Sequence, residues 1–212
     1  MKALLSTTYF GPVQWYQKLH RYDEVEIEQW ESFQKQTYRN RCLIATTQGV
    51  QALTVPIERS NPSTVNTIKD IRISDHGNWR HLHWNALVSA YGESPFFEYY
   101  QDDIRPFFEK RWAYLFDYNE AIREKMCELL DIEAKVSFSL EFKVKSTINY
   151  QLSTINKTND FREAINPKHP QPDPDFEPKP YYQVYQQKHG FLANLSVLDL
   201  LFNMGPEGIF YL

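Results

Sequence analysis

The sequence has little of what stabilises small secreted proteins. Cysteine occurs only twice in 212 residues, as Cys42 and Cys127, and the two positions follow no spacing typical of metal ligands. This excludes a framework of several disulfides and favours two buried thiols in a reducing compartment over one disulfide or a nucleophilic cysteine. Glycine is also scarce, with seven residues, whereas aromatic residues make up 16% of the chain, a composition typical of a globular protein.

Long apolar runs and an excess of positive charge are lacking as well. No window approaches the roughly 18 apolar residues of a membrane span, and the apolar residues after Lys2 are too few for the core of a signal peptide. The formal net charge is −4, with 23 Lys and Arg against 27 Asp and Glu, which is unlike a nucleic-acid-binding surface. We therefore expect a cytoplasmic protein with no integral membrane segment and no nucleic-acid partner.

The first 60 residues predict strands that alternate with a helix. A short apolar strand at 3–8 precedes an amphipathic helical segment at 13–19 and a second strand at 25–28. Residues 42–45 and 53–56 read as the two arms of a β-hairpin, because turn-forming residues separate them.

From Trp79 onward the periodicity is helical. Apolar residues at 79–91 form one helical stripe, Ser94-Pro95 begins a second helix, and 115–130 marks a third. Residues 135–145 then alternate between apolar and polar, which predicts a strand with one buried face. Together these patterns predict a single α/β domain over 1–212, with a mixed sheet and a helical middle region; an α+β arrangement is the alternative.

Residues 146–180 differ in composition from the rest of the chain. Six of the twelve prolines lie there, at 167, 170, 172, 174, 178 and 180, which predicts an extended arm, a lid or a loop within the domain. After this segment, Ser196 is suited to cap a helix, and Gly205-Pro206 is suited to end it. Such a helix implies that the C-terminal segment docks back on the domain.

The densest group of polar residues lies at 33–41. Its three cations, Lys35, Arg39 and Arg41, stand beside amides that include Asn40. This combination suits recognition of a phosphate or carboxylate group, because arginine offers a bidentate fork and amides fix orientation. The alternative is a solvated loop whose cations pair with nearby glutamates.

Three histidines bear on the chemistry. His83 lies on the apolar stripe of 79–91, where it is either a general base or a hydrogen-bonded core residue. His81 points to a different face of that helix, so the pair predicts no metal site. His189 lies shortly before the C-terminal helix, where backbone N–H groups can bind anions; the alternative is a loop histidine without a role. No familiar catalytic or nucleotide-binding motif occurs, and spacing alone therefore identifies no reaction.

Several segments in register resemble the WbqC-like protein family, in the style of its Bacteroidetes members. They cover nearly the whole chain: 34–41 with Leu53-Thr54-Val55-Pro56, Ile68-Lys69-Asp70-Ile71, Trp79 with His83 and Tyr91, Ser94-Pro95-Phe96-Phe97, and 190–203. One departure concerns the residues after the second strand. Many members carry two adjacent aspartates there, where this chain has Glu28-Gln29-Trp30-Glu31.

The resemblance implies a role in bacterial surface polysaccharide (O-antigen) synthesis. The family is usually described as glycine or aminoacyl transferases that act on a sugar, so the implied substrate is a small molecule such as a nucleotide- or lipid-linked sugar; the cofactor is undefined. Acyl transfer needs a base and donors for the developing oxyanion. The implied catalytic residues are His83 and Asn40, and the implied substrate-binding residues are Lys35, Arg39, Arg41, Trp15, Trp79, Tyr91 and His189. We expect one pocket to unite 34–41, His83 and 189–203.

Two other functions are compatible with the sequence. The first is a non-enzymatic binding or assembly protein of a polysaccharide pathway, which forms homo-oligomers through the 146–180 arm. The second is a nucleotide-binding α/β protein, suggested by the strand–helix–strand order of 3–28, in which ligands lie beyond the carboxyl ends of the strands.

Overall fold

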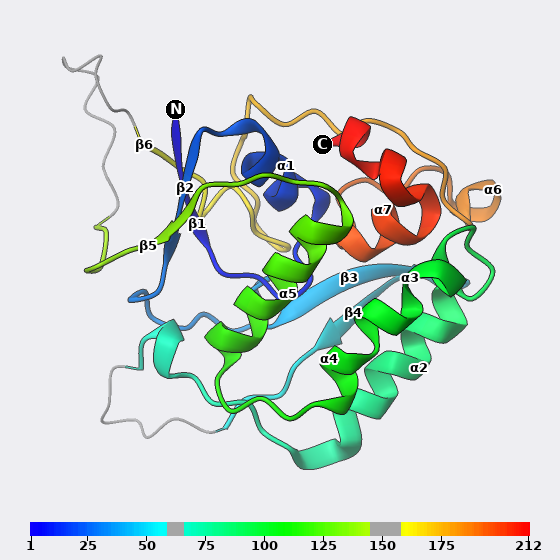
Figure 1. Ribbon diagram of the computed structural model, residues 1–212, viewed down its shortest axis with the longest axis horizontal. Coiled ribbons are helices and arrows are strands. Elements are labelled where there is room, and N and C mark those ends of the chain that lie inside the picture. Colours follow the sequence, from blue (N-terminus) through cyan, green and yellow to red (C-terminus); the bar gives the residue numbers. More distant parts are fainter. Residues whose placement is uncertain (59–65, 145–157) are drawn as a thin grey trace.

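A strand–helix–strand unit begins the fold, as the sequence predicts. The computed structural model describes residues 1–58, 66–144 and 158–212. Strand β1 (Lys2–Ser6) pairs in parallel with β2 (Glu24–Glu28), with Ala3 opposite Val25, and helix α1 (Val13–Arg21) connects them (Figure 1). Parallel pairing requires such a crossover, because the second strand must start at the same edge as the first.

Two short strands from the later half of the chain complete this sheet. Strand β5 (Val136–Phe138) pairs with β2, and β6 (Thr158–Asp160) pairs with β1. The order is β5-β2-β1-β6, and all neighbours are parallel. All four carboxyl ends therefore lie at one edge of the sheet.

A separate antiparallel hairpin lies beside the parallel sheet. It consists of β3 (Arg41–Thr46) and β4 (Gly49–Thr54), which confirms the predicted hairpin. The second arm, predicted at 53–56, begins four residues earlier and ends at Thr54, because the turn is only Thr47-Gln48. Gly49 follows the turn with a φ of +105°, a backbone conformation that favours glycine. The fold is thus α/β, with both parallel and antiparallel pairing in one chain.

Helices surround the hairpin and fill the space between the two sheets (Figure 1). The middle of the chain forms α2 (Trp79–Tyr91), α3 (Phe97–Ile104), α4 (Pro106–Glu109) and α5 (Leu115–Leu129). The bounds of α2 are those the apolar stripe predicts.

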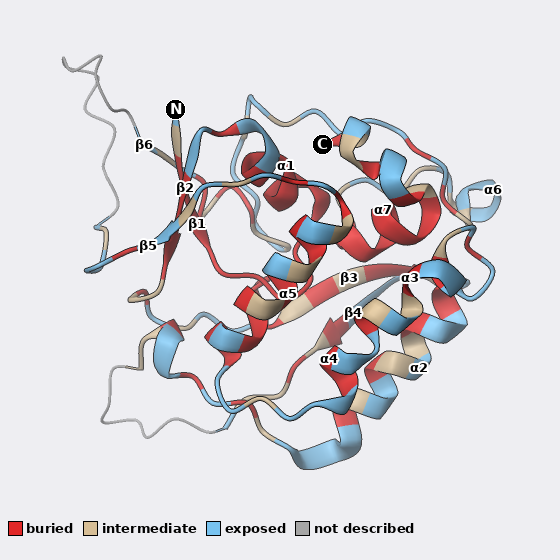
Figure 2. Cartoon of the chain, in the orientation of Figure 1, coloured by how far each residue is buried: buried red, intermediate tan, exposed pale blue. Residues whose placement is uncertain are grey.

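The C-terminal segment adds α6 (Gln186–His189), α7 (Val197–Met204) and a 3₁₀ helix over Gly205–Tyr211. Ser196 caps α7 as expected, because its hydroxyl accepts a hydrogen bond from Leu198 N. All of α7 before Met204 is buried, so the C-terminal helix does dock on the domain (Figure 2).

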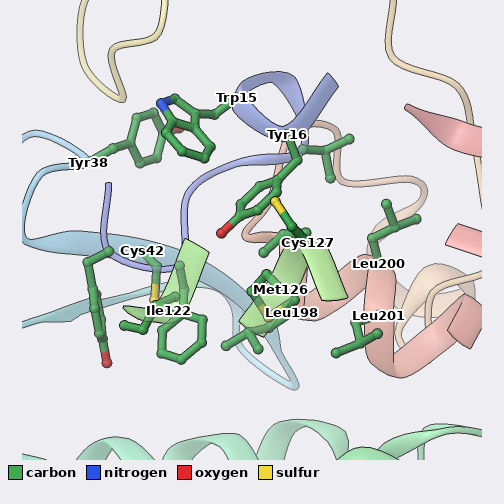
Figure 3. Packing of buried hydrophobic residues seen from close by; sticks show 14 of the residues in the cluster. Trp15, Tyr16, Tyr38, Cys42, Ile122, Met126, Cys127, Leu198, Leu200 and Leu201 are labelled. Carbon is green, nitrogen blue, oxygen red and sulfur yellow. The ribbon is translucent and has the colours of Figure 1, made fainter. Parts of the chain in front are cut away.

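One continuous apolar core joins these elements. Trp15 and Tyr16 of α1, Leu198 of α7 and Met126 of α5 are all nearly inaccessible to solvent (Figure 3). Both cysteines are buried and free, which confirms the prediction of two thiols. Burial raises the pKa of Cys127 to about 11, so this sulfur stays protonated and unreactive at neutral pH.

The predicted strand at 135–145 is much shorter than its alternating pattern indicates. Only Val136–Phe138 pair with β2, and the apolar residues that follow, including Leu140 at 90% exposure, lie on the surface. The chain leaves the sheet because Ser139 turns inward: its hydroxyl donates to the Glu28 carboxylate at 2.6 Å. Lys143 N then donates to the other oxygen of the same carboxylate, which holds the backbone away from the sheet. The last position of the predicted strand lies outside the described residues.

The described part of the Pro-rich segment lies against the domain. Residues 146–157 of that segment fall outside the described residues, whereas 158–160 form β6 and 161–180 run over α1 with mainly irregular structure. Lys18 of α1 and Asp173 form an ion pair of 2.8 Å in which both side chains are almost fully buried. Gln14 also donates to Asp173, and the Lys18 ammonium lies 4.4 Å from the ring centre of Phe161. These contacts fasten the segment to the helix that follows β1.

Candidate functional site

The carboxyl edge of the parallel sheet gathers a dense set of polar side chains. In open parallel sheets, ligands bind at this edge, where connections from neighbouring strands leave in different directions. Here the chain leaves β1 to reach β2 on one side, whereas β6 pairs with β1 on the other side. The point between β1 and β6 is therefore the position at which the topology favours a site.

A small pocket lies at that point. It combines hydroxyl residues from the end of β1, aromatic rings and two arginines: Ser6, Thr7, Thr8, Trp15, Tyr38, Arg39, Phe161, Arg162 and Ile165. Trp15 and Tyr38, which appear close together in Figure 3, are two of the aromatic residues that line it. The enclosed space of about 10 Å³ is enough for one water molecule. Phe161, Arg162 and Ile165 belong to the Pro-rich segment, which thus forms one wall of the pocket.

Arg39 is held in place by a carboxylate and a hydroxyl. Its Nε and Nη2 donate to the two oxygens of Glu31 at 2.8 and 2.6 Å, and Nη2 also donates to Ser6 Oγ at 2.9 Å. The side chain is only 3% exposed. Asn119 donates to the Arg39 carbonyl and fixes the backbone just before β3. A guanidinium bound in this bidentate way has one orientation, which suits recognition of a planar or tetrahedral anion.

Arg162 is held in the same manner from the other side of the pocket. Nε and Nη2 donate to the two oxygens of Asp160 at 2.9 and 2.6 Å, and Nη1 lies 3.6 Å from Glu28. Glu28 in turn accepts hydrogen bonds from Ser139 Oγ and from Trp30 N. The carboxylates thus stand behind both guanidinium groups, and the residues described as lining the pocket include two cations and no acid.

The three hydroxyl residues at the end of β1 and directly after it, Ser6, Thr7 and Thr8, complete the polar surface of the pocket. Thr7 donates to Glu120 at 3.2 Å, and burial raises the pKa of that carboxyl group. The Thr8 hydroxyl is buried and has no hydrogen-bond partner within the described parts of the chain. A buried polar atom without a partner is costly, and a ligand in the pocket would supply one. The groups that this pocket presents to a ligand are thus two arginines, each paired with a carboxylate behind it, and the unpartnered hydroxyl of Thr8.

The remaining predicted residues lie in other parts of the molecule. Nδ1 of His83 is hydrogen-bonded to the Tyr9 hydroxyl at 2.9 Å. The imidazole ring also packs against the ring of Trp79, with 5.1 Å between the ring centres. Burial lowers the pKa of His83 to about 4, so the ring is neutral at pH 7. Trp79 donates to Ser74 O, and the Tyr91 hydroxyl donates to Asp199 at 3.0 Å.

The 34–41 segment divides between the pocket and the hairpin. Lys35 is exposed to solvent. Asn40 donates to Val55 O at 2.9 Å, and Arg41 donates to Thr54 at 3.0 Å, so both side chains support the hairpin. His189, on α6, donates to the carbonyl of Thr46 at 3.1 Å.

The pocket therefore brings together Arg39 and Trp15 from the predicted set. Of the described residues that line it, none comes from 189–203, and His83 is not among them. Arg162 and the hydroxyls of Ser6-Thr7-Thr8 were missed, because Arg162 lies far along the chain in a Pro-rich context. The rule that ligands bind at the carboxyl ends of parallel strands could have found these three hydroxyl residues, since they form the carboxyl end of the first predicted strand, 3–8.

The structure thus defines an α/β protein with a small polar pocket, lined by two arginines, at the carboxyl edge of a parallel sheet. A family model of the WbqC-like protein family matches residues 7–211, and the chain therefore belongs to this family. It is 25% identical over 218 residues to uncharacterized protein Rv1507c of Mycobacterium tuberculosis, an alignment that covers 96% of this chain and 91% of that protein. No solved structure shows significant similarity.

Two further observations concern metal ligands and membrane-spanning helices among the described residues. Over 1–58, 66–144 and 158–212, no three His, Cys, Asp or Glu side chains are grouped as metal ligands are. In the same parts of the chain, no helix has both the length and the apolar character that crossing a membrane requires.

Proposed function

We propose that this protein is a transferase of bacterial surface polysaccharide (O-antigen) biosynthesis that binds a phosphate-bearing sugar, nucleotide- or lipid-linked, between Arg39 and Arg162. The observation that carries the proposal is that these two guanidinium groups line the same pocket and are oriented by carboxylates behind them. Nε and Nη2 of both arginines bind these carboxylates, so the remaining N–H groups of the two guanidinium groups are the charged donors left for the oxygens of a phosphate or diphosphate. Membership of the WbqC-like family supports the polysaccharide context, and glycine or another aminoacyl group is the proposed transferred group.

Substrate entry requires the outer wall of the pocket to move. The pocket as described has room for about one water molecule, and its wall consists of residues 161–165 from the Pro-rich segment. Outward movement of this wall would carry Arg162 with it and widen the space between the two arginines, while Arg39, which is anchored on the β3 side, keeps its position. Trp15 and Tyr38 would then present aromatic faces to a sugar or a base.

His83 is a weak candidate for the base in this proposal. Its two ring nitrogens bond to the Tyr9 hydroxyl and to the Thr54 backbone, and burial lowers its pKa to about 4. A ring with so low a proton affinity accepts a proton poorly at neutral pH. Glu120 is better placed, because burial raises its pKa and its carboxylate contacts Thr7 of the pocket.

The proposal predicts that Arg39→Lys and Arg162→Lys each weaken binding of UDP-N-acetylglucosamine. Lysine keeps the positive charge but cannot hold the carboxylate through two parallel hydrogen bonds, so its ammonium is no longer fixed toward the pocket. The loss of a charge-assisted hydrogen bond to the ligand is worth about 1.5–3 kcal/mol, or roughly 10–150-fold in affinity. Isothermal titration calorimetry measures the effect directly. Arg41→Lys is the matched control, because Arg41 lies two residues from Arg39 but contacts Thr54 of the hairpin.

Binding that is equal in all three variants would contradict the pocket assignment. Mass spectrometry of the nucleotide sugar, after incubation with the protein and several aminoacyl donors, tests for transfer of an acyl group. Binding of the nucleotide sugar without any such addition would instead favour a non-enzymatic binding protein of the same pathway.

A further inference from the structure

A second and larger hollow lies between the β3–β4 hairpin and α2. Its volume is about 740 Å³, within the range of sites for small ligands. The hairpin turn at 46–48 and the outer residues of β4 form one wall, the exposed side of α2 forms the other, and Tyr185 stands at one end. The outer turns of α2 and the strand β4 are largely solvent-exposed (Figure 2). We call this hollow the hairpin groove.

The side chains of the hairpin groove are uncharged. Amides and hydroxyls supply its polar surface, among them Gln48, Gln51, Asn85 and Ser89, and none of the described residues that line it is acidic or basic. Its apolar surface includes two large side chains that are more than half exposed, Leu82 at 59% and Val50 at 52%. A charged ligand would lose hydration here without meeting a counter-charge.

Hydrogen bonds hold both walls of the hairpin groove in place. Lys188 and His189 donate to the carbonyls of Thr47 and Thr46, so α6 fixes the hairpin turn from outside. On the opposite wall, Asn85 is hydrogen-bonded to His81 at 2.9 Å, one turn earlier on α2. A preformed groove loses little conformational entropy when a ligand binds.

We propose that the hairpin groove binds a neutral oligosaccharide, the acceptor chain of the transferase; this inference rests on the proposed function. Amide and hydroxyl side chains both donate and accept hydrogen bonds, as the hydroxyl groups of a sugar do. Leu82, Val50 and the ring of Tyr185 offer apolar surfaces to the C–H faces of sugar rings. The charged sugar donor and the neutral acceptor would thus bind at different sites, each of matching chemistry.

The experiment is a ¹H–¹⁵N NMR titration of the full chain with maltohexaose, cellohexaose and chitohexaose at millimolar concentration. We expect at least one of them to shift the resonances of 46–51 and 82–89 in a saturable manner. Asn85→Ala and Gln51→Ala should each weaken that binding about tenfold, the loss expected for a hydrogen bond or two. Ser89→Trp should abolish it by filling the groove. All three positions are exposed, and Tyr99→Ala, an exposed aromatic residue on α3 outside the groove, is the control.

Three outcomes would overturn the proposal. One is that none of the three hexasaccharides shifts these resonances. Another is that Ser89→Trp leaves the binding unchanged. The third is that an uncharged extended peptide shifts the same resonances more strongly, which would make the groove a peptide site beside the outer strand of the hairpin. Failure of the proposed function gives a different result: Arg39→Lys then leaves binding of the nucleotide sugar unchanged, whereas the hexasaccharide titration still reports on the hairpin groove. If both proposals hold, Arg39→Lys weakens binding of the nucleotide sugar and leaves hexasaccharide binding intact.

Discussion

Replacement of Glu31 by alanine is expected to lower the free energy of unfolding by about 3–5 kcal/mol, because it leaves a buried cation without its partner. Arg39 makes two hydrogen bonds of 2.8 and 2.6 Å to this carboxylate, and both side chains are less than 10% exposed. After the substitution, Ser6 Oγ is the acceptor that remains for the guanidinium. Urea-induced unfolding followed by circular dichroism measures the change in free energy.

The exposed pair of Arg105 and Glu109 supplies the control. Its two side chains are 56% and 58% exposed, so Glu109→Ala should cost less than about 1 kcal/mol. A double variant, Glu31→Leu with Arg39→Met, removes both charges and should recover most of the stability lost by Glu31→Ala. A loss below about 1 kcal/mol in Glu31→Ala would show that the Arg39 site is solvated and not buried.

The same ion pairs connect stability with the proposed binding. Arg39 and Arg162 are oriented toward the pocket because Glu31, Asp160 and Glu28 hold them. The cost of burying these charges is offset only when their geometry is good, and the resulting fixed orientation is what an anion-binding site needs. A variant in which uncharged residues replace all five members of this network should therefore keep the fold but no longer bind the anionic ligand.

The N-terminus of α1 differs from the corresponding helix of dinucleotide-binding folds. In dinucleotide-binding folds, the helix after the first strand directs free N–H groups at a pyrophosphate. Here Val13 N donates to Leu195 O and Gln14 N donates to Asn194 Oδ1, so the C-terminal segment occupies these donors. An anion at this edge must depend on side chains, which agrees with the two arginines of the pocket.

Elements with strong local signals were predictable from the sequence. The apolar stripe of 79–91 gives the bounds of α2, and the capping serine and the following Gly205 give those of α7, because both depend on contacts within a few residues. The hairpin was predictable for the same reason: its two arms are close in sequence, and a glycine at a positive φ directly follows the turn.

Features that depend on distant partners were not predictable. The alternation of 135–145 indicates a long strand, but the strand ends at Phe138 because Ser139 and Lys143 bond to Glu28, more than 100 residues earlier. Likewise, no local pattern places Arg162 beside the end of β1; only the pairing of β6 with β1 does so. The apolar setting of His83 is equally compatible with catalysis and with a role in the core, and the choice between them depends on neighbours such as Tyr9, which is 74 residues away.

Asp199 is expected to make the protein less stable as the pH rises from about 4 to about 6. Its carboxylate lies in the core at the start of α7 and accepts hydrogen bonds from the hydroxyls of Tyr91 and Tyr181 and from Gln183. Burial raises the pKa of Asp199 to about 6, although the three hydrogen bonds partly oppose the shift. The unfolded chain ionises near 3.9, so between these values the folded state binds more protons. Stability therefore falls with rising pH across this window, by about 3 kcal/mol for a shift of about two units.

Asp199→Asn isolates this contribution because asparagine has nearly the same shape and does not titrate. The free energy of unfolding of both proteins is measured in urea at several pH values between 4 and 8, and the variant is subtracted from the wild type. Titrations elsewhere cancel in this difference, so it should decline by about 2 kcal/mol between pH 4 and 7, the rest of the effect lying below pH 4, and stay level above. The exposed Asp117 in the first turn of α5, replaced in the same way, controls for the loss of one carboxylate. A difference that rises with pH would mean that the three donors outweigh burial, and the Asp199 carboxylate would then stabilise α7 as a permanent anion.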